Sequence, residues 1–233
     1  MNALFSVYAW IVWALALVIL GLPALLLTVI SPRLGFRAAK VLAGVALFLT
    51  GIRVKVIGRE KVDWSRPHVF MGNHQNLLDP FAYVLAIPVF MVGIEKKENH
   101  RIPIYGWISR AWGNLPIDRS NPGAARETIA LAAERFKEGT SVTILPEGTR
   151  TKDGRIGPFK KGGFHLAVGT GSDIVPFTFN GAYERLKAGS WRITPGTIEV
   201  VFSEAIPTEG YGKENLDELV ERVRGAVCAN FKG

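Results

Sequence analysis

HVFMGNHQNLLDPF, His68 to Phe81, is the stretch that decides the expected fold, because it reads as a strand, a tight turn and the start of a helix. The apolar run that ends near Met71 predicts a buried strand. Pro80 is typical of the first helical position, and Asp79 directly before it predicts an N-cap. A strand that passes into a helix through so short a turn is the building unit of an α/β domain.

The rest of the chain repeats this alternation. Seven short runs rich in β-branched and apolar residues predict strands or strand ends, at residues 53–58, 68–73, 89–95, 113–119, 142–148, 174–180 and 197–203. Residues 120–139 predict a helix capped by Ser120 or Asn121, and residues 213–232 predict a terminal amphipathic helix. The pattern favours an α/β sheet with helices on its faces, and 233 residues suit one such domain with a small appendage.

The N-terminal segment differs in composition from everything after it. Residues 1–30 contain no Asp, Glu, Lys or Arg, and residues 3–30 are long enough to cross a hydrocarbon core of roughly 30 Å. A cleaved signal peptide fits poorly, because no basic residues precede the apolar run. Pro23 predicts a kink, and a second apolar piece at residues 41–52 suits a re-entrant or interfacial helix better than a span.

These features divide the chain in two. Residues 1–52 are expected to form a membrane-anchoring helical pair, with spanning and one-leaflet insertion both open, and residues 53–233 an α/β domain. Arg33, Arg37 and Lys40 lie between the two apolar pieces and would face anionic headgroups. By the positive-inside tendency, the chain that follows them is then cytoplasmic.

The net charge, the cysteine count and the absence of certain motifs limit the possible classes of function. A net charge of +8 suits nucleic acid, an anionic membrane or a phosphorylated substrate, so its sign alone decides nothing. The single cysteine, Cys228, excludes an intramolecular disulfide framework. The sequence contains no Cys/His metal cluster, Walker loop or dinucleotide glycine fingerprint.

His74 and Asp79 are the strongest candidates for a catalytic pair. Five residues on one helix lie about 140° apart, so only a strand–turn–helix geometry brings the two side chains together. They then act as a general base with its orienting carboxylate, or they are a hydrogen-bonded core histidine and an ordinary helix cap. The spacing leaves both interpretations open.

Two further segments carry groups suited to phosphate. In LPEGTR, Gly148 frees backbone N–H groups to approach an anion, Thr149 adds a hydroxyl and Arg150 a planar fork; the alternative is a tight turn in which Arg150 pairs with Glu147. A second turn, at residues 113–120, also carries an arginine that can reach a phosphate.

In that second turn, Arg119 can point at the same phosphate while Asp118 holds it in position, and the alternative is a surface ion pair. Lys96, with Lys97 beside it, is either a third phosphate ligand or part of a solvated edge.

Taken in order, these motifs resemble the glycerolipid acyltransferases, in particular the 1-acyl-sn-glycerol-3-phosphate acyltransferases. NHQNLLDP is similar to that family's first block, GNLPIDR to its second, LPEGTRT to its third and IVPFTFN to its fourth. The lysine-bearing segment EKKENHRIPIYGW lies between the first two, and the resemblance runs from about residue 40 to residue 205. It implies a mixed sheet flanked by helices, with an N-terminal apolar helical membrane anchor.

The resemblance also implies a reaction. An acyl group passes from acyl carrier protein or acyl-CoA to the sn-2 hydroxyl of lysophosphatidic acid and gives phosphatidic acid. His74 is expected to act as general base and Asp79 to orient it. Lys96, Arg119 and Arg150 are expected to bind the glycerol phosphate in a loop shaped by Gly148 and Thr149.

No metal or cofactor is expected, because a thioester is already activated. The expected partners are membrane lipids, lysophosphatidic acid and the acyl donor, without nucleic acid, at the cell inner membrane or its equivalent with the catalytic domain on the cytoplasmic side. Three alternatives stay open: an acyltransferase of the same fold acting on another lysophospholipid or a lyso-ornithine lipid, a hydrolase in which His74 activates water, and a non-enzymatic membrane adaptor.

Overall fold

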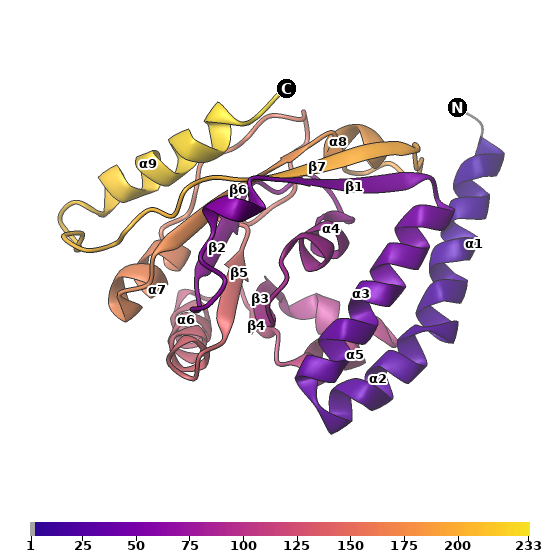
Figure 1. Ribbon diagram of the computed structural model, residues 1–233, viewed down its shortest axis with the longest axis horizontal. Coiled ribbons are helices and arrows are strands. Elements are labelled where there is room, and N and C mark those ends of the chain that lie inside the picture. The colour runs from indigo at the N-terminus through magenta and orange to yellow at the C-terminus, as the bar shows by residue number, and fades with distance from the viewer. Residues whose placement is uncertain (1–2) are drawn as a thin grey trace.

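The computed structural model describes residues 3–233, so Met1 and Asn2 of the expected anchor lie outside the described residues. Its centre is a seven-stranded sheet in the order β1-β7-β6-β2-β5-β3-β4 (Figure 1). The strands are β1 (Ile52–Ile57), β2 (Val69–Gly72), β3 (Met91–Lys96), β4 (Leu115–Ile117), β5 (Ser141–Ile144), β6 (Ile174–Asn180) and β7 (Gly196–Phe202). Each overlaps one of the seven predicted runs, so the strand predictions are confirmed.

Strand pairing makes the sheet mixed, as expected. All neighbouring strands run parallel except β6 and β7, which pair antiparallel. Every residue of β2, β5 and β6 is buried, which is typical of central strands covered on both faces. Because β2, β5, β3 and β4 are parallel neighbours, the loops that follow them gather at one edge of the sheet.

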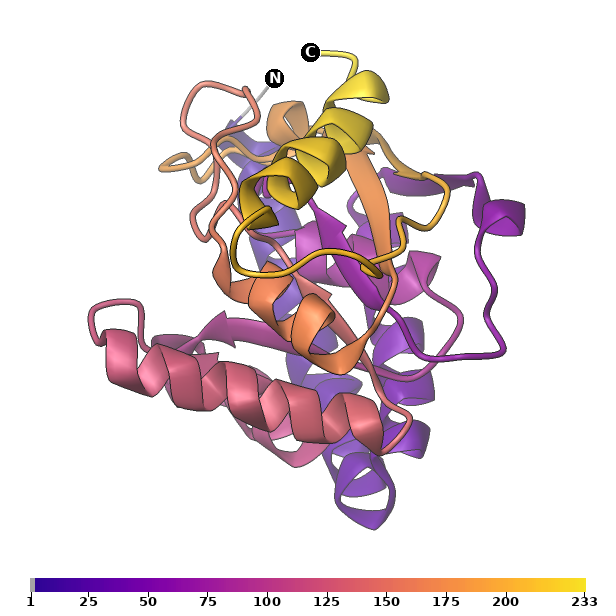
Figure 2. The same cartoon turned by 90° about the vertical axis from the view of Figure 1, so that its left-hand side faces the viewer.

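Helices cover both faces of this sheet. They are α1 (Ala3–Ile19), α2 (Gly21–Ile30), α3 (Pro32–Leu49), α4 (Asp79–Ala86), α5 (Tyr105–Trp112), α6 (Pro122–Lys137), α7 (Gly162–Thr170), α8 (Ala182–Arg185) and α9 (Leu216–Ala229). Figure 1 shows α6, α7 and α9 on one side of the sheet and α1 to α5 on the other. Figure 2 looks onto the face of the sheet that α6, α7 and α9 cover.

The two long helices predicted in the α/β part are confirmed. α6 falls within residues 120–139, and Asn121 rather than Ser120 caps it: its Oδ1 accepts from the backbone N–H groups of Gly123 at 3.0 Å and Ala124 at 3.2 Å. α9 falls within residues 213–232 and buries one apolar face.

The N-terminal helices form a hairpin against the domain. α1 and α2 run on from Ala3 to Ile30, interrupted only at Leu20. The break lies one turn before Pro23, which has no N–H to donate to the carbonyl four residues earlier. α3 begins at Pro32, earlier than expected, so the basic segment lies inside this helix and not ahead of it; Ile52 already belongs to β1.

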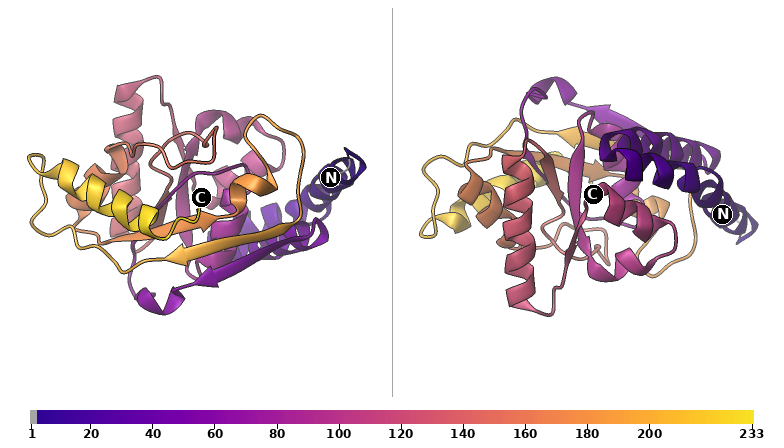
Figure 3. Two further views of the ribbon diagram at one scale, coloured as in Figure 1. Left: turned by 90° about the horizontal axis from the view of Figure 1, so that it is seen from above. Right: turned by 90° about the horizontal axis from the view of Figure 1, so that it is seen from below.

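The inner face of this hairpin contacts the α/β domain, and its outer face is exposed. Trp10 Nε1 donates to the Trp191 carbonyl at 2.7 Å, and Trp13 packs on Phe81 with ring centroids 4.5 Å apart. Figure 3 shows the hairpin helices at one end of the molecule. The most apolar 18-residue window between Ala3 and Ile30 has a mean hydropathy of 2.5, and only 28% of that window is buried. So large an exposed apolar surface indicates membrane association. The membrane role assigned to residues 1–52 as a unit stays a prediction.

Candidate active site

His74 and Asp79 are in direct contact. β2 ends at Gly72, the chain turns through His74, and α4 begins at Asp79. His74 Nδ1 lies 2.8 Å from Asp79 Oδ2, with the carboxylate fully buried and the imidazole 18% exposed. An ionised carboxylate only accepts hydrogen bonds, so Nδ1 carries the proton and Nε2 is left as a proton acceptor. The strand–turn–helix geometry expected for this pair is therefore present.

The Asp79 carboxylate holds the turn as well as the ring. The same Oδ2 accepts the backbone N–H of Gln75 at 2.6 Å and that of Asn76 at 2.9 Å. The prediction that Asp79 is an N-cap is wrong, because α4 starts at Asp79 and Leu78 stands in the cap position. Its carboxylate points back to the loop instead of forward to the helix N–H groups.

Two asparagines on either side of the histidine anchor the turn to β6 and α8. Asn73, which is completely buried, exchanges two hydrogen bonds with the backbone of Phe179, at 2.7 and 3.1 Å. Asn76 donates to the Ala182 carbonyl. Sequence reasoning did not assign these residues a role, although two amides directly flanking HQ at a buried strand end were a visible signal.

The loop after β5 clamps the backbone of His74. Glu147 accepts the N–H of His74 at 2.7 Å on one carboxylate oxygen and that of Gly157 at 2.8 Å on the other, while Thr151 N–H donates to the His74 carbonyl at 2.9 Å. Burial raises the pKa of the Glu147 carboxyl, and the two N–H groups oppose this. Glu147 is a second positioning residue that the sequence prediction had considered only as a partner for Arg150.

Because Glu147 is occupied by backbone, the alternative of a turn closed by an Arg150–Glu147 pair is wrong. Arg150 makes no ion pair within residues 3–233, and both it and Thr149 are exposed. Gly148 has φ +70°, a backbone conformation that favours glycine, and the Lys160 side chain lies against it.

Lys96 and Arg119 lie at the same edge but further along it. Lys96 ends β3 opposite Ile117 of β4, and Arg119 follows β4 by two residues. Asp118 was expected to hold Arg119, and instead its carboxylate pairs with Lys97 at 2.5 Å. Hydrogen bonds from Lys97 and Ser120 lower the pKa of Asp118 to about 2.

Strand order sets how far apart the predicted phosphate ligands lie. From β2, which leads to His74, β5 is one strand away, β3 two and β4 three. At roughly 4.8 Å per strand, β4 lies about 14 Å from β2. Gly148, Thr149 and Arg150 lie in the loop between Glu147 and Thr151, the two residues that bind the backbone of His74. Lys96 and Arg119 lie at the same edge, two and three strands from β2, and Lys96 pairs with Glu98 at 3.6 Å.

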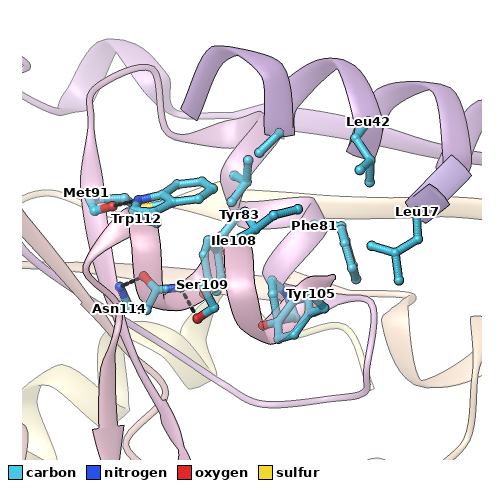
Figure 4. A pocket seen from close by; sticks show the side chains of 14 residues that line it. Leu17, Leu42, Phe81, Tyr83, Met91, Tyr105, Ile108, Ser109, Trp112 and Asn114 are labelled. Atoms are coloured by element: carbon cyan, nitrogen blue, oxygen red, sulfur yellow. Dashed lines mark hydrogen bonds between the residues drawn. The ribbon is translucent and has the colours of Figure 1, made fainter. Parts of the chain in front are cut away.

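An apolar pocket lies along α4, the helix that begins at Asp79 (Figure 4). Pro80 and Phe81, the residues directly after Asp79, line it together with residues from α1, α3 and α5. Leu17 and Leu42 of the N-terminal hairpin approach from one side, and Tyr105 and Trp112 from the other. Its lining is suited to an apolar ligand such as a hydrocarbon chain.

The sequence matches known acyltransferases. A profile of the Acyltransferase family covers residues 53–180. A 1-acyl-sn-glycerol-3-phosphate acyltransferase from Limnanthes douglasii is 31% identical over 200 residues, covering 85% of this chain and 70% of that protein. A protein of the same name from Pseudomonas aeruginosa is 34% identical over 187 residues, covering 78% and 72%.

The fold agrees with the sequence match. The crystal structure of the 1-acyl-sn-glycerophosphate (LPA) acyltransferase PlsC from Thermotoga maritima superimposes with a TM-score of 0.82 at 27% identity, over 97% of this chain and 94% of that one. Profile, relatives and structure agree with one another, and the chain belongs to the Acyltransferase family, among the 1-acyl-sn-glycerol-3-phosphate acyltransferases.

Proposed function

We propose that this enzyme transfers a fatty acyl group from a thioester to the sn-2 hydroxyl of lysophosphatidic acid and so makes phosphatidic acid for phospholipid synthesis. One observation carries the proposal: a histidine whose Nδ1 is held at 2.8 Å by a buried carboxylate, at the edge of the sheet where Arg150 makes no ion pair within residues 3–233. This arrangement suits deprotonation of a hydroxyl next to a phosphate.

In the proposed step, His74 Nε2 takes the hydroxyl proton as the oxygen attacks the thioester carbon. The tetrahedral intermediate then collapses, the C–S bond breaks, and the departing sulfur receives the proton from the imidazolium. Asp79 favours the imidazolium through the Nδ1–H bond. The thioester is already activated, so we propose no metal or cofactor in this step.

Two groups of residues position the substrates. Arg150, on the loop that clamps His74, would hold the phosphate together with Lys96 and Arg119 from the neighbouring strand ends, and Gly148 and Thr149 would shape that loop. The apolar pocket beside Pro80 would take an acyl chain. Support for these roles comes from placement at one sheet edge.

The donor is acyl-CoA or acyl carrier protein, and the acceptor reaches the site from the membrane in which the hairpin is held. Arg33, Arg37 and Lys40 follow the apolar helix, so we propose the inner membrane or its equivalent, with the catalytic domain on the cytoplasmic side.

The test is a panel of lysolipids assayed with both donor types and the full-length protein. Lysophosphatidic acid should be acylated far faster than lysophosphatidylcholine or a lyso-ornithine lipid, because only it carries a phosphate monoester. Equal rates with a zwitterionic lysolipid would refute the assigned acceptor. Release of free fatty acid at the same rate without any acceptor would instead identify a thioester hydrolase.

A further inference from the structure

A second, basic cavity lies at the opposite edge of the sheet from His74. Its volume is about 360 Å³, within the range of small-ligand sites, and it is lined by residues that precede β2, β3 and β5 together with the first half of α3. Its lining includes Arg33, Arg37, Lys40 and Arg66, together with the aromatic side chains of Trp64 and Phe90. The length of β5, about 13 Å for four residues, separates this end of the sheet from the active-site loops.

The cavity carries positive charge that the described chain does not neutralise. Arg33, Arg37 and Lys40 form no ion pair within residues 3–233. The fourth cation, Arg66, is bound by Asp173 at 2.5 Å and by a second carboxylate, which fixes its guanidinium in the wall. Three free cations in one concavity repel one another, and an anion placed among them removes that repulsion.

Lys40 is partly buried and lies near another positive charge, so a bound anion would stabilise its charged form. Its ammonium lies 4.6 Å from the centre of the Phe36 ring, half withdrawn from water. Burial lowers the pKa of Lys40, and the nearby charge of Arg59 lowers it further. Arg59 itself donates a hydrogen bond to the Ala86 carbonyl at 2.7 Å.

The helix that supplies the cations also exposes apolar surface beside them. Arg33, Arg37 and Lys40 recur at intervals of four and three, so they form one row along α3. Leu34 and Val41 lie about 100° round the helix from this row, 40% and 58% exposed. α3 therefore presents exposed apolar side chains next to its row of cations.

We propose that this cavity binds the phosphate of an anionic membrane phospholipid, with the headgroup among Arg33, Arg37 and Lys40 and the acyl chains along the exposed face of α3. The three cations supply charge-assisted hydrogen bonds to phosphate oxygens, and Trp64 and Phe90 wall the glycerol side. The site is separate from the one that transfers the acyl group, and the hairpin brings it to the membrane surface.

Lys40 provides a direct readout. The full-length protein is placed in nanodiscs of phosphatidylcholine alone or of phosphatidylcholine mixed with phosphatidylglycerol, treated with an amine-acetylating reagent, and analysed by mass spectrometry. Lys213, an exposed lysine ahead of α9, serves as the internal reference. Phosphatidylglycerol should slow acetylation of Lys40 severalfold relative to Lys213.

Variants separate a site from general charge attraction. Arg37→Gln should abolish the protection of Lys40, whereas Arg126→Gln, which removes an equal charge from exposed α6, should keep it. Both variants should transfer acyl groups at the parent rate in phosphatidylcholine nanodiscs, which shows that they fold; Arg33→Gln replaces Arg37→Gln if the latter does not.

Four results would overturn the proposal. They are no protection of Lys40, equal protection of Lys213, protection that survives Arg37→Gln, and equal protection by inorganic phosphate in phosphatidylcholine nanodiscs. The last result would assign the cavity to a soluble phosphate and not to a lipid.

Discussion

Replacing Asp79 by asparagine distinguishes the two things that its carboxylate does. In this structure one oxygen, Oδ2, accepts all three hydrogen bonds: from His74 Nδ1, Gln75 N and Asn76 N. The other oxygen, Oδ1, is buried without a partner in the described chain. An amide must keep its own oxygen at the Oδ2 position, because an NH₂ group there would face two backbone N–H donors.

Asp79→Asn should therefore leave the ring in its working orientation and tautomer while the charge is lost. A hydrogen bond to a charged group contributes about 1.5–3 kcal/mol and one to a neutral group about 0.5–1.5, so the change costs about 1–2 kcal/mol. That corresponds to a loss of about 5- to 30-fold in kcat. A ring trapped in the wrong tautomer, as in a serine-protease triad with the same change, loses about 10⁴-fold.

The control is Asp79→Ala, which leaves the ring N–H and two backbone N–H groups without an acceptor. Each unsatisfied buried group costs about 1–3 kcal/mol, so this variant should lose far more activity and also melt earlier. The assay is kcat for acyl transfer to lysophosphatidic acid, with thermal unfolding measured alongside. If Asp79→Asn loses as much activity as Asp79→Ala, or none at all, the assigned role of Oδ2 is refuted.

The remaining predictions concern the other site residues. His74→Ala should abolish transfer while the protein still folds and binds membranes, and full residual activity would exclude it as the base. Arg150→Ala should raise KM for lysophosphatidic acid at least tenfold, roughly the contribution of one charge-assisted bond, whereas Arg155→Ala, in the same exposed segment, should not; an effect confined to the acyl donor would refute the phosphate assignment. Burial raises the pKa of Glu147 in the folded protein, so folding binds its proton more tightly and stability falls as pH rises from about 4.3 toward neutrality. Glu147→Gln should remove that slope, seen in urea unfolding across this pH range, and lower activity because one backbone N–H then meets an NH₂ group.

The strands and long helices could be predicted because their signals are local. Each of the seven strand runs carries its own β-branched pattern, and Asn121 with Pro122 marks the start of α6 without any knowledge of the rest of the chain. The apolar stretch to Ile30 likewise indicates a membrane helix from composition alone. The prediction for the second apolar helix was wrong at its boundaries. It was placed at residues 41–52, whereas α3 begins at Pro32 and includes the basic residues.

The site depended on contacts that no local pattern contains. His74 and Asp79 were paired correctly as candidates, yet the direction of the Asp79 carboxylate follows from how the turn wraps round it, and the N-cap prediction failed for that reason. Asp118 pairs with Lys97 because β3 and β4 are neighbours, a fact of strand order and not of sequence distance.

By itself, the sequence determined the fold class, the apolar N-terminal stretch, the family resemblance and the candidate catalytic pair, because these rest on residue type, spacing and periodicity. Only the tertiary structure decided how His74 is held: Glu147 and Thr151, more than seventy residues away in the chain, bind its backbone, and Asn73 ties it to β6. It also gathered Arg33, Arg37, Lys40 and Arg66 around one cavity. Such groupings arise when distant segments pack together, and a hydrogen bond or a repulsion exists only once the two groups are within a few ångströms.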